Sequence, residues 1–180
     1  MQEKKTALIA GASGIVGRGI AERLVGDGWR VLCASRSGGG HLPGTEGVAV
    51  DLLDAEACAR AVAPHAGITH VFHAAFQPAP SRAAEVAPNL AMLRNVVEAV
   101  QQASPALRKV VLVTGAGGSI GSELCRQIAQ YQPSMLVLFE QSEYAMYKVD
   151  AELREHFPDM GVAGIVGDVK NARRMAQVMH

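Results

Sequence analysis

Short apolar segments alternate with amphipathic segments along the chain. The apolar segments are five to eight residues long, contain few polar positions and are followed by turns rich in glycine, serine or aspartate. Such segments are typical of strands that are buried on both faces of a parallel sheet. Seven strands are predicted, over residues 6–10, 30–35, 47–52, 69–76, 109–115, 135–140 and 162–169.

Between these segments, apolar residues recur at helical spacing. The longest amphipathic segment carries Val86, Leu90, Leu93, Val97 and Val100 on one face. Six helices are predicted, over residues 15–25, 55–62, 83–103, 119–130, 143–157 and 171–180.

Alternating strands and helices predict an α/β fold with a single doubly wound, Rossmann-type parallel sheet and helices on both faces. Because crossovers between parallel strands are right-handed, strands 2 and 3 lie on one side of strand 1 and strands 4 to 7 on the other. The predicted strand order is therefore 3-2-1-4-5-6-7. One domain over residues 1–180 uses every element, and its two half-units, residues 1–108 and 109–180, share strand 5.

A glycine-rich turn, GASGIVG, joins the first strand to the first helix. Gly11 permits the tight turn, Gly14 lets the backbone approach a pyrophosphate, and Gly17 allows close packing of the helix. The free N–H groups at the helix N-terminus favour phosphate. The turn predicts a dinucleotide site rather than a purely structural loop, and its other members are Ser13, Ile15 and Val16.

The end of the second strand distinguishes between two cofactors. An acidic residue there would bind the ribose 2′-hydroxyl of NAD, whereas this chain has Ser35 and Arg36. Arg36 can pair with a 2′-phosphate as a planar donor fork; the alternative is a solvated surface side chain. We therefore expect NADP(H) to be preferred, with NAD(H) as the other candidate.

Other strand ends complete the predicted site. Asp51 and Leu52 follow the third strand, where they would meet the adenine. Ala74 and Ala75 are small enough to let the ribose and nicotinamide pass over the sheet, and Phe76 comes next.

Residues 5–114 resemble the N-terminal half of an extended short-chain dehydrogenase/reductase, and within that family the progesterone 5β-reductase (iridoid synthase-like) group. The likeness rests on GASGIVG, on SR after the second strand, on THVFHAAF, and on NLAMLRNVVEAV leading into KVVLVTG. That group uses NADPH, which agrees with the interpretation of Arg36.

Residues 109–180 resemble the opening of the polysaccharide-biosynthesis nucleotide-sugar 4,6-dehydratases, through VLVTGAGGSIGSELCRQIAQYQPSMLVLFEQSEYAMYKVDAELRE and VGDV. The match ends shortly after the third strand of that pattern, so we expect a chimera joined at a strand that both families share. We expect the second loop to be empty or to hold a small anion. The resemblance implies a second phosphate turn with ribose and adenine contacts, formed by Gly115, Gly118, Ser119, Ile120, Gly121, Glu140, Asp168 and Val169.

The composition of the chain argues against several classes of partner: nucleic acid, membranes and metal ions. The 17 basic residues balance 17 acidic ones and are scattered, which argues against nucleic acid. No apolar run reaches the roughly 18 residues of a membrane span, and no signal peptide is recognisable, so we expect a cytoplasmic protein away from membranes. Cys33, Cys58 and Cys125 are widely spaced and the six histidines show no ligand spacing, so no metal site is expected. The partner expected is the dinucleotide; a homodimer stays open.

Tyr144 and Lys148 have the Tyr-x-x-x-Lys spacing of short-chain dehydrogenases, in which the lysine lowers the tyrosine pKa. That family carries the pair after strand 5, whereas here it follows strand 6. We therefore expect no competent catalytic set and favour a binding domain. The alternatives are an active NADPH-dependent oxidoreductase and a structural module whose glycine turns bind nothing.

Overall fold

The computed structural model describes residues 5–38, 42–104, 109–112, 115–133, 135–168, 171 and 173; the side chains of residues 82 and 109–112 lie outside the description. Its elements are β1 (Thr6–Ala10), α1 (Ile15–Gly26), β2 (Arg30–Ser35), β3 (Thr45–Ala49), α2 (Ala55–Val62), β4 (His70–His73), α3 (Arg82–Ala103), β5 (Lys109–Leu112), α4 (Ser119–Gln130), β6 (Met135–Glu140), α5 (Glu143–His156) and β7 (Gly161–Val166).

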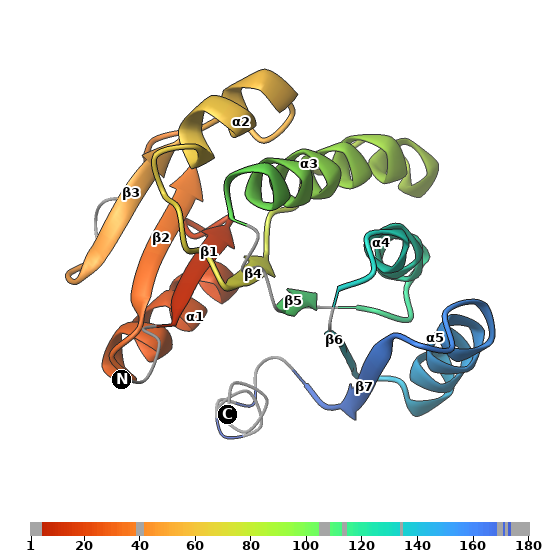
Figure 1. Cartoon of the computed structure of the whole chain (residues 1–180). Helices are drawn as coiled ribbons and strands as arrows, with labels where there is room; N and C mark the ends of the chain where they lie inside the picture. The colour runs from red at the N-terminus through yellow and green to blue at the C-terminus, as the bar shows by residue number, and fades with distance from the viewer. Residues whose placement is uncertain are drawn as a thin grey trace.

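The strands form one seven-stranded sheet in the order β3-β2-β1-β4-β5-β6-β7, and all of its pairs are parallel. The predicted fold class and strand order are confirmed. Within the described ranges, α1 packs on one face, and α2, α3, α4 and α5 pack on the other (Figure 1). Ala10 pairs with Ala34 and His73, and His73 pairs with Leu112, so the strand ends meet at one edge of the sheet.

Several strand boundaries differ from the predicted ones. β3 ends at Ala49 because Asp51 starts a turn in which its carboxylate accepts the Leu53 N–H at 3.0 Å. β4 ends at His73, and farther along Gln77 bonds to the side chain of Asn89 instead of to a strand. The predicted strand end beyond residue 168 and most of the predicted helix 171–180 lie outside the described residues.

Side chains alternate between the two faces of the sheet, and both faces are apolar. Ala7 and Ile9 of β1 pack with α1, whereas Leu8 and Ala10 pack with α2 and α3. All five residues of β1 are buried. The unbroken apolar run in the sequence therefore reflects a strand covered on both sides, as expected for a parallel sheet.

His73 is a polar exception in this core. Its side chain lies at the end of β4, it is only 2% exposed, and no described residue hydrogen-bonds either ring nitrogen. Burial without a partner disfavours the charged imidazolium and lowers the pKa of His73 to about 4. The ring is therefore neutral in the folded protein at neutral pH.

We expect His73→Leu to flatten the pH dependence of stability. Between pH 6.5 and about 4 the unfolded imidazole takes up a proton that the folded one refuses, so the free energy of unfolding falls as the pH falls. Urea unfolding at pH 6.5 and 4.5 should show the parent chain losing about 2–3 kcal/mol more than the variant over this interval. Parallel losses in the two proteins would show that His73 does not titrate as described.

Candidate functional site

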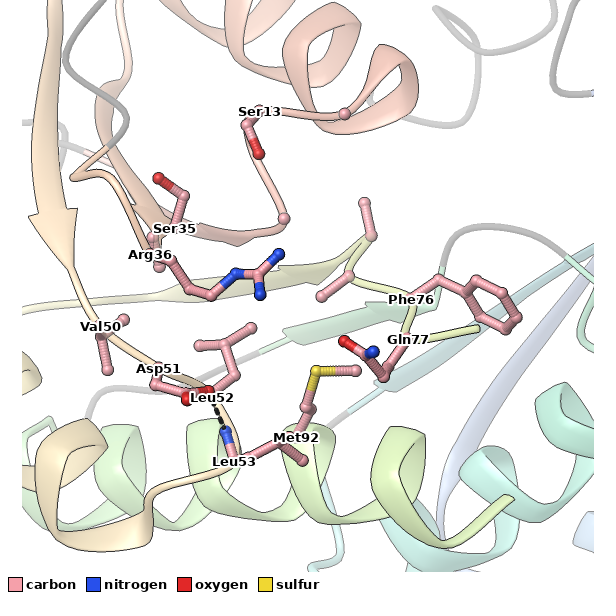
Figure 2. Close-up of a pocket in the computed structure, with 15 residues that line it drawn as sticks. Ser13, Ser35, Arg36, Val50, Asp51, Leu52, Leu53, Phe76, Gln77 and Met92 are labelled. Carbon is pink, nitrogen blue, oxygen red and sulfur yellow. Dashed lines mark hydrogen bonds between the residues drawn. The ribbon is translucent and has the colours of Figure 1, made fainter. Parts of the chain in front are cut away.

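A cleft of about 340 Å³ opens at the edge where β1, β2 and β4 end (Figure 2). The chain order in the sheet reverses beside β1, and ligands of doubly wound sheets bind at such switch points. The lining residues are Gly11, Ser13, Gly14, Ala34, Ser35, Arg36, Val50, Asp51, Leu52, Leu53, Ala74, Ala75, Phe76, Gln77 and Met92.

The first glycine loop is shaped by close backbone approaches. Gly11 has a φ of +82°, and a Cβ there would lie 2.6 Å from the Cα of Ala75. A Cβ on Gly17 would collide with the carbonyl of Gly11. Gly14 differs, because its Cβ would meet only the Gly11 carbonyl at 3.5 Å, an ordinary contact. The fold itself thus requires Gly11 and Gly17 but not Gly14.

The helix that begins at this loop has an uncapped N-terminus. Helices α2, α3 and α5 are capped by the side chains of Asp54, Ser81 and Ser142. Helices α1 and α4, which follow the two glycine loops, have glycine at the N-cap, no side-chain cap and no acidic residue in the first turn. The first N–H groups of a helix lack intrahelical acceptors. At α1 these donors lie beside Ile15, which is 95% exposed, and the half-buried Val16.

The end of β2 supplies one cation and two hydroxyls. Arg36 is exposed and its guanidinium points into the cleft (Figure 2). No described residue forms a hydrogen bond or an ion pair with this guanidinium. The Ser35 hydroxyl is buried and lies 3.4 Å from that of Ser37. Anionic ligands are the chemistry that this arrangement fits.

The β3 side of the cleft is held by α3 and α2. Leu52 is buried and its carbonyl accepts a hydrogen bond of 2.9 Å from the Asn95 side chain. Beneath it, the Cys58 thiol donates weakly to the Asp51 carbonyl at 3.7 Å. Burial, with the charges of Asp54 and Asp51, raises the pKa of Cys58 to about 11, so this thiol stays protonated.

The β4 side is held by a second asparagine of α3. The buried Asn89 accepts from the Gln77 N–H at 2.8 Å and donates to the Gln77 carbonyl at 2.9 Å. It thereby fixes the chain after the half-buried Ala74 and Ala75, whereas Phe76 is 58% exposed. Sequence reasoning missed both asparagines. Two polar residues on the apolar face of the helix were the available signal.

Other cleft residues were also missed. They are Ala34, Val50, Leu53, Gln77 and Met92. Of the residues predicted for the first site, all line the cleft except Ile15, Val16 and Gly17, which belong to the start of α1.

The second glycine loop repeats the geometry but satisfies one donor internally. Gly115 has a φ of +64°, and a Cβ on Gly121 would collide with the Gly115 carbonyl. The Glu140 carboxylate accepts the Gly117 N–H at 2.9 Å, and it also accepts the N–H groups of the two residues after it. Ser119 is exposed and Ile120 half-buried in the first turn of α4.

None of the residues predicted for the second loop lines the cleft beside β1. Gly118 is the N-cap of α4, and Asp168 lies just beyond β7. Val169 falls outside the described residues.

The predicted tyrosine–lysine pair lies on α5 and does not line the cleft. Tyr144 is 73% exposed, and the Lys148 ammonium lies over its ring at 5.8 Å from the centroid. Within the described ranges no group of three or more His, Cys, Asp or Glu side chains could hold a metal ion. No helix in the same ranges combines the length and apolarity of a membrane span.

Comparisons with known proteins divide the chain at β5. The NAD dependent epimerase/dehydratase family matches residues 7–110, and a polysaccharide biosynthesis protein family matches residues 111–180. The boundary between the two matches falls inside β5.

Two kinds of curated relatives match the chain. The capsular polysaccharide biosynthesis protein CapD of Staphylococcus aureus is 38% identical over 73 residues, which are 40% of this chain and 12% of CapD. A 3-oxo-Delta(4,5)-steroid 5-beta-reductase of Arabidopsis thaliana is 32% identical over 127 residues, 66% of this chain and 32% of the reductase. The chain thus spans a third or less of the length of these relatives.

Solved structures share the fold at low identity. Uronate dehydrogenase from Agrobacterium tumefaciens, complexed with NAD, has a TM-score of 0.61 at 18% identity, covering 91% of this chain and 77% of its own. A short chain dehydrogenase from Burkholderia cenocepacia, in complex with NADP, has a TM-score of 0.58 at 20% identity, covering 99% of this chain and 94% of its own.

The family match at residues 7–110 spans more than half of the 180 residues and contains the first glycine loop, the ends of β2 and β4, and all of the residues that line the cleft. The chain therefore belongs to the NAD dependent epimerase/dehydratase family.

Proposed function

We propose that the chain binds NADP(H) in the cleft beside the first glycine loop, as a binding domain without a competent catalytic set. The observation that carries this proposal is Arg36, whose guanidinium points into the cleft at the end of β2 and pairs with none of the residues that the structure describes. A cation at this position fits a 2′-phosphate, whereas NAD would be recognised there by a carboxylate.

The rest of the cleft fits a dinucleotide. The uncapped N–H groups of α1 supply donors for a pyrophosphate. Packing within the protein does not require a glycine at position 14, because a Cβ there would make only an ordinary contact, so a close approach by phosphate would explain this glycine. Asp51 and Leu52 would meet the adenine, and Ala74 and Ala75 would lie beneath the nicotinamide ribose. The bound cofactor would supply a hydride at its nicotinamide ring.

We infer that the second loop does not take part in this site. Glu140 already accepts the N–H of Gly117, so one donor of this loop is satisfied within the protein, and a carboxylate at this position disfavours a 2′-phosphate. The loop also follows β5, separated from the loop of β1 by β4 alone, so two complete dinucleotides would crowd each other.

We further propose that the chain is one domain in which two half-units, residues 1–108 and 109–180, share β5. Support comes from the pairing of β5 with β4 on one side and with β6 on the other. The two family matches also meet within this strand. A separate second unit would contain only two further strands, which is too little surface for a stable core.

A second candidate function is NADPH-dependent reduction. Two observations favour this reaction: the chain belongs to the NAD dependent epimerase/dehydratase family, and the cleft has an exposed side at Phe76 where a substrate could enter. Reduction also requires a proton donor near the nicotinamide. Tyr144, the candidate donor, belongs to α5 and is absent from the cleft lining.

Replacing Arg36 by alanine should weaken NADPH binding by roughly 1.5–3 kcal/mol, the range for hydrogen bonds to charged groups, and should change NADH binding little. Isothermal titration calorimetry of both cofactors measures this difference. Arg60→Ala, which removes an exposed arginine of α2, is the matched control and should behave like the parent. Equal affinities of the parent chain for NADPH and NADH would contradict the assignment, and no binding of either would favour a structural module.

Hydrogen exchange tests the single-domain proposal. The β6 amides and the β1 amides should exchange through the same global opening, because both strands lie inside one sheet. Native-state exchange at increasing denaturant, followed by mass spectrometry, gives the opening free energy of each strand. An independent opening of residues 135–166 at clearly lower free energy would show that the two half-units are separate.

Tyr144→Phe should leave any trace NADPH oxidation unchanged, because the phenol is exposed on α5 rather than placed in the cleft. Steady-state rates with NADPH and a carbonyl substrate, alongside the NADPH affinity, provide the measurement. A large loss of turnover with fold and NADPH affinity intact would mean that Tyr144 reaches the reacting atoms.

A further inference from the structure

The turn that follows β3 forms one wall of the cleft and contains its own hydrogen bonds. The Asp51 carboxylate accepts the Leu53 N–H at 3.0 Å (Figure 2), and the Asp51 carbonyl accepts the Asp54 N–H at 3.1 Å. Residues 50–53 all line the cleft. These bonds join residues two or three positions apart, so they shape the turn but do not fix it to the rest of the protein.

One long-range bond ties this turn to α3. The Asn95 side chain donates from Nδ2 to the Leu52 carbonyl at 2.9 Å, across 43 positions of the chain. The N–H of the same peptide group belongs to Leu53 and is the donor to Asp51. Both ends of this planar group therefore have partners, and the bond from Asn95 anchors it to the helix.

The Asn95 side chain acts from behind the wall. It is only 8% exposed and is not among the residues that line the cleft, whereas Met92, one turn earlier on α3, does line it. A buried amide needs a partner inside the protein. The weak contact of the Cys58 thiol with the Leu52 carbonyl, at 3.9 Å, is a poor substitute for the bond from Asn95.

The N–H of Leu52 is a donor that no described residue accepts. Because a trans peptide is planar, this N–H points opposite to the Asp51 carbonyl, which is directed at Asp54 before the start of α2. Leu52 is only 7% exposed and lines the cleft. A backbone donor in so buried a residue needs an acceptor, which a ligand in the cleft would supply.

A base of the cofactor offers such an acceptor. Adenine has a bare ring nitrogen, N1, beside its amino group, whereas hypoxanthine carries a hydrogen on N1. A backbone N–H held in one place bonds to adenine N1 and is opposed by the N1 hydrogen of hypoxanthine. Sites that bond one group of a ligand reject analogues that leave their own polar groups unpaired.

We propose that Asn95 is a positioning residue that makes the cleft selective for an adenine base, by holding the turn so that Leu52 presents its N–H to adenine N1. This selectivity rests on the proposed binding of NADP(H) in the cleft. Asn95 does not touch the cofactor and acts through the Leu52 carbonyl. Arg36 recognises the 2′-phosphate at the end of β2, so selection of the base and selection of the phosphate depend on different elements.

Calorimetric titration of the full chain with NADPH and with its hypoxanthine analogue tests this role. The parent should prefer NADPH by about tenfold or more, because the analogue leaves the Leu52 donor unpaired. Asn95→Leu keeps the size of the side chain and removes the donor to Leu52, so the preference should fall to about threefold or less. The preference for NADPH over NADH should persist, because Arg36 is unchanged.

Ser104→Ala is the matched control on the same helix. Ser104 is the C-cap of α3 and is 1% exposed, and its hydroxyl accepts the Ile68 N–H at 3.0 Å. Ile68 precedes β4, so this bond lies toward the opposite edge of the sheet from the cleft. The variant also removes one buried hydrogen bond of α3, but it should keep the parental ratio of the two affinities.

A folded Asn95→Leu chain with the parental ratio would overturn the proposal, as would an equal fall of the ratio in Ser104→Ala. A parent chain that binds NADPH and the hypoxanthine analogue equally would overturn it too and would leave the proposed function intact. A parent chain that binds neither would contradict both. If Asn95→Leu does not fold, Asn95→Ser provides the test, since its shorter side chain loses the direct contact with Leu52 and should also lower the ratio. An unchanged ratio in that variant would count against the proposal equally.

Discussion

Parallel pairing of β5 with both β4 and β6 is the constraint on which the structure depends. Because His73 pairs with Leu112, and Leu112 pairs with Leu138, the strand ends of the two halves align along one edge. Both glycine loops consequently emerge on the same edge, and helices α3, α4 and α5 share one apolar layer. The boundary between the two family matches falls in this strand, where two related sheets can be joined without a break in the ladder.

The two loops have nearly the same backbone and opposite chemistry. Each begins with a glycine at positive φ and ends in an uncapped helix. Beyond the first loop, Arg36 is a cation without a partner among the described residues; beyond the second, the Glu140 carboxylate already accepts a loop N–H. The difference lies where the next strand ends: Arg36 follows β2, whereas Glu140 is the last residue of β6. A 2′-phosphate therefore fits the first loop and not the second.

The topology and the glycine positions could be predicted from the sequence because they depend on local patterns and on the handedness of crossovers. The side-chain contacts that hold the walls of the cleft could not be predicted. Asn95 reaches Leu52 across 43 positions and Asn89 reaches Gln77 across 12, and such contacts exist only once the helix lies over the sheet. The contact between Arg154 and Val162 likewise depends on how α5 lies over β7, which periodicity alone does not specify.

A structure of the chain determined with NADPH at saturating concentration tests the central claim most directly. The account predicts one dinucleotide, with its pyrophosphate at the start of α1 and its 2′-phosphate beside Arg36. A dinucleotide seated on the second glycine loop beside Glu140, or one at the first loop whose 2′-phosphate points away from Arg36, would contradict it.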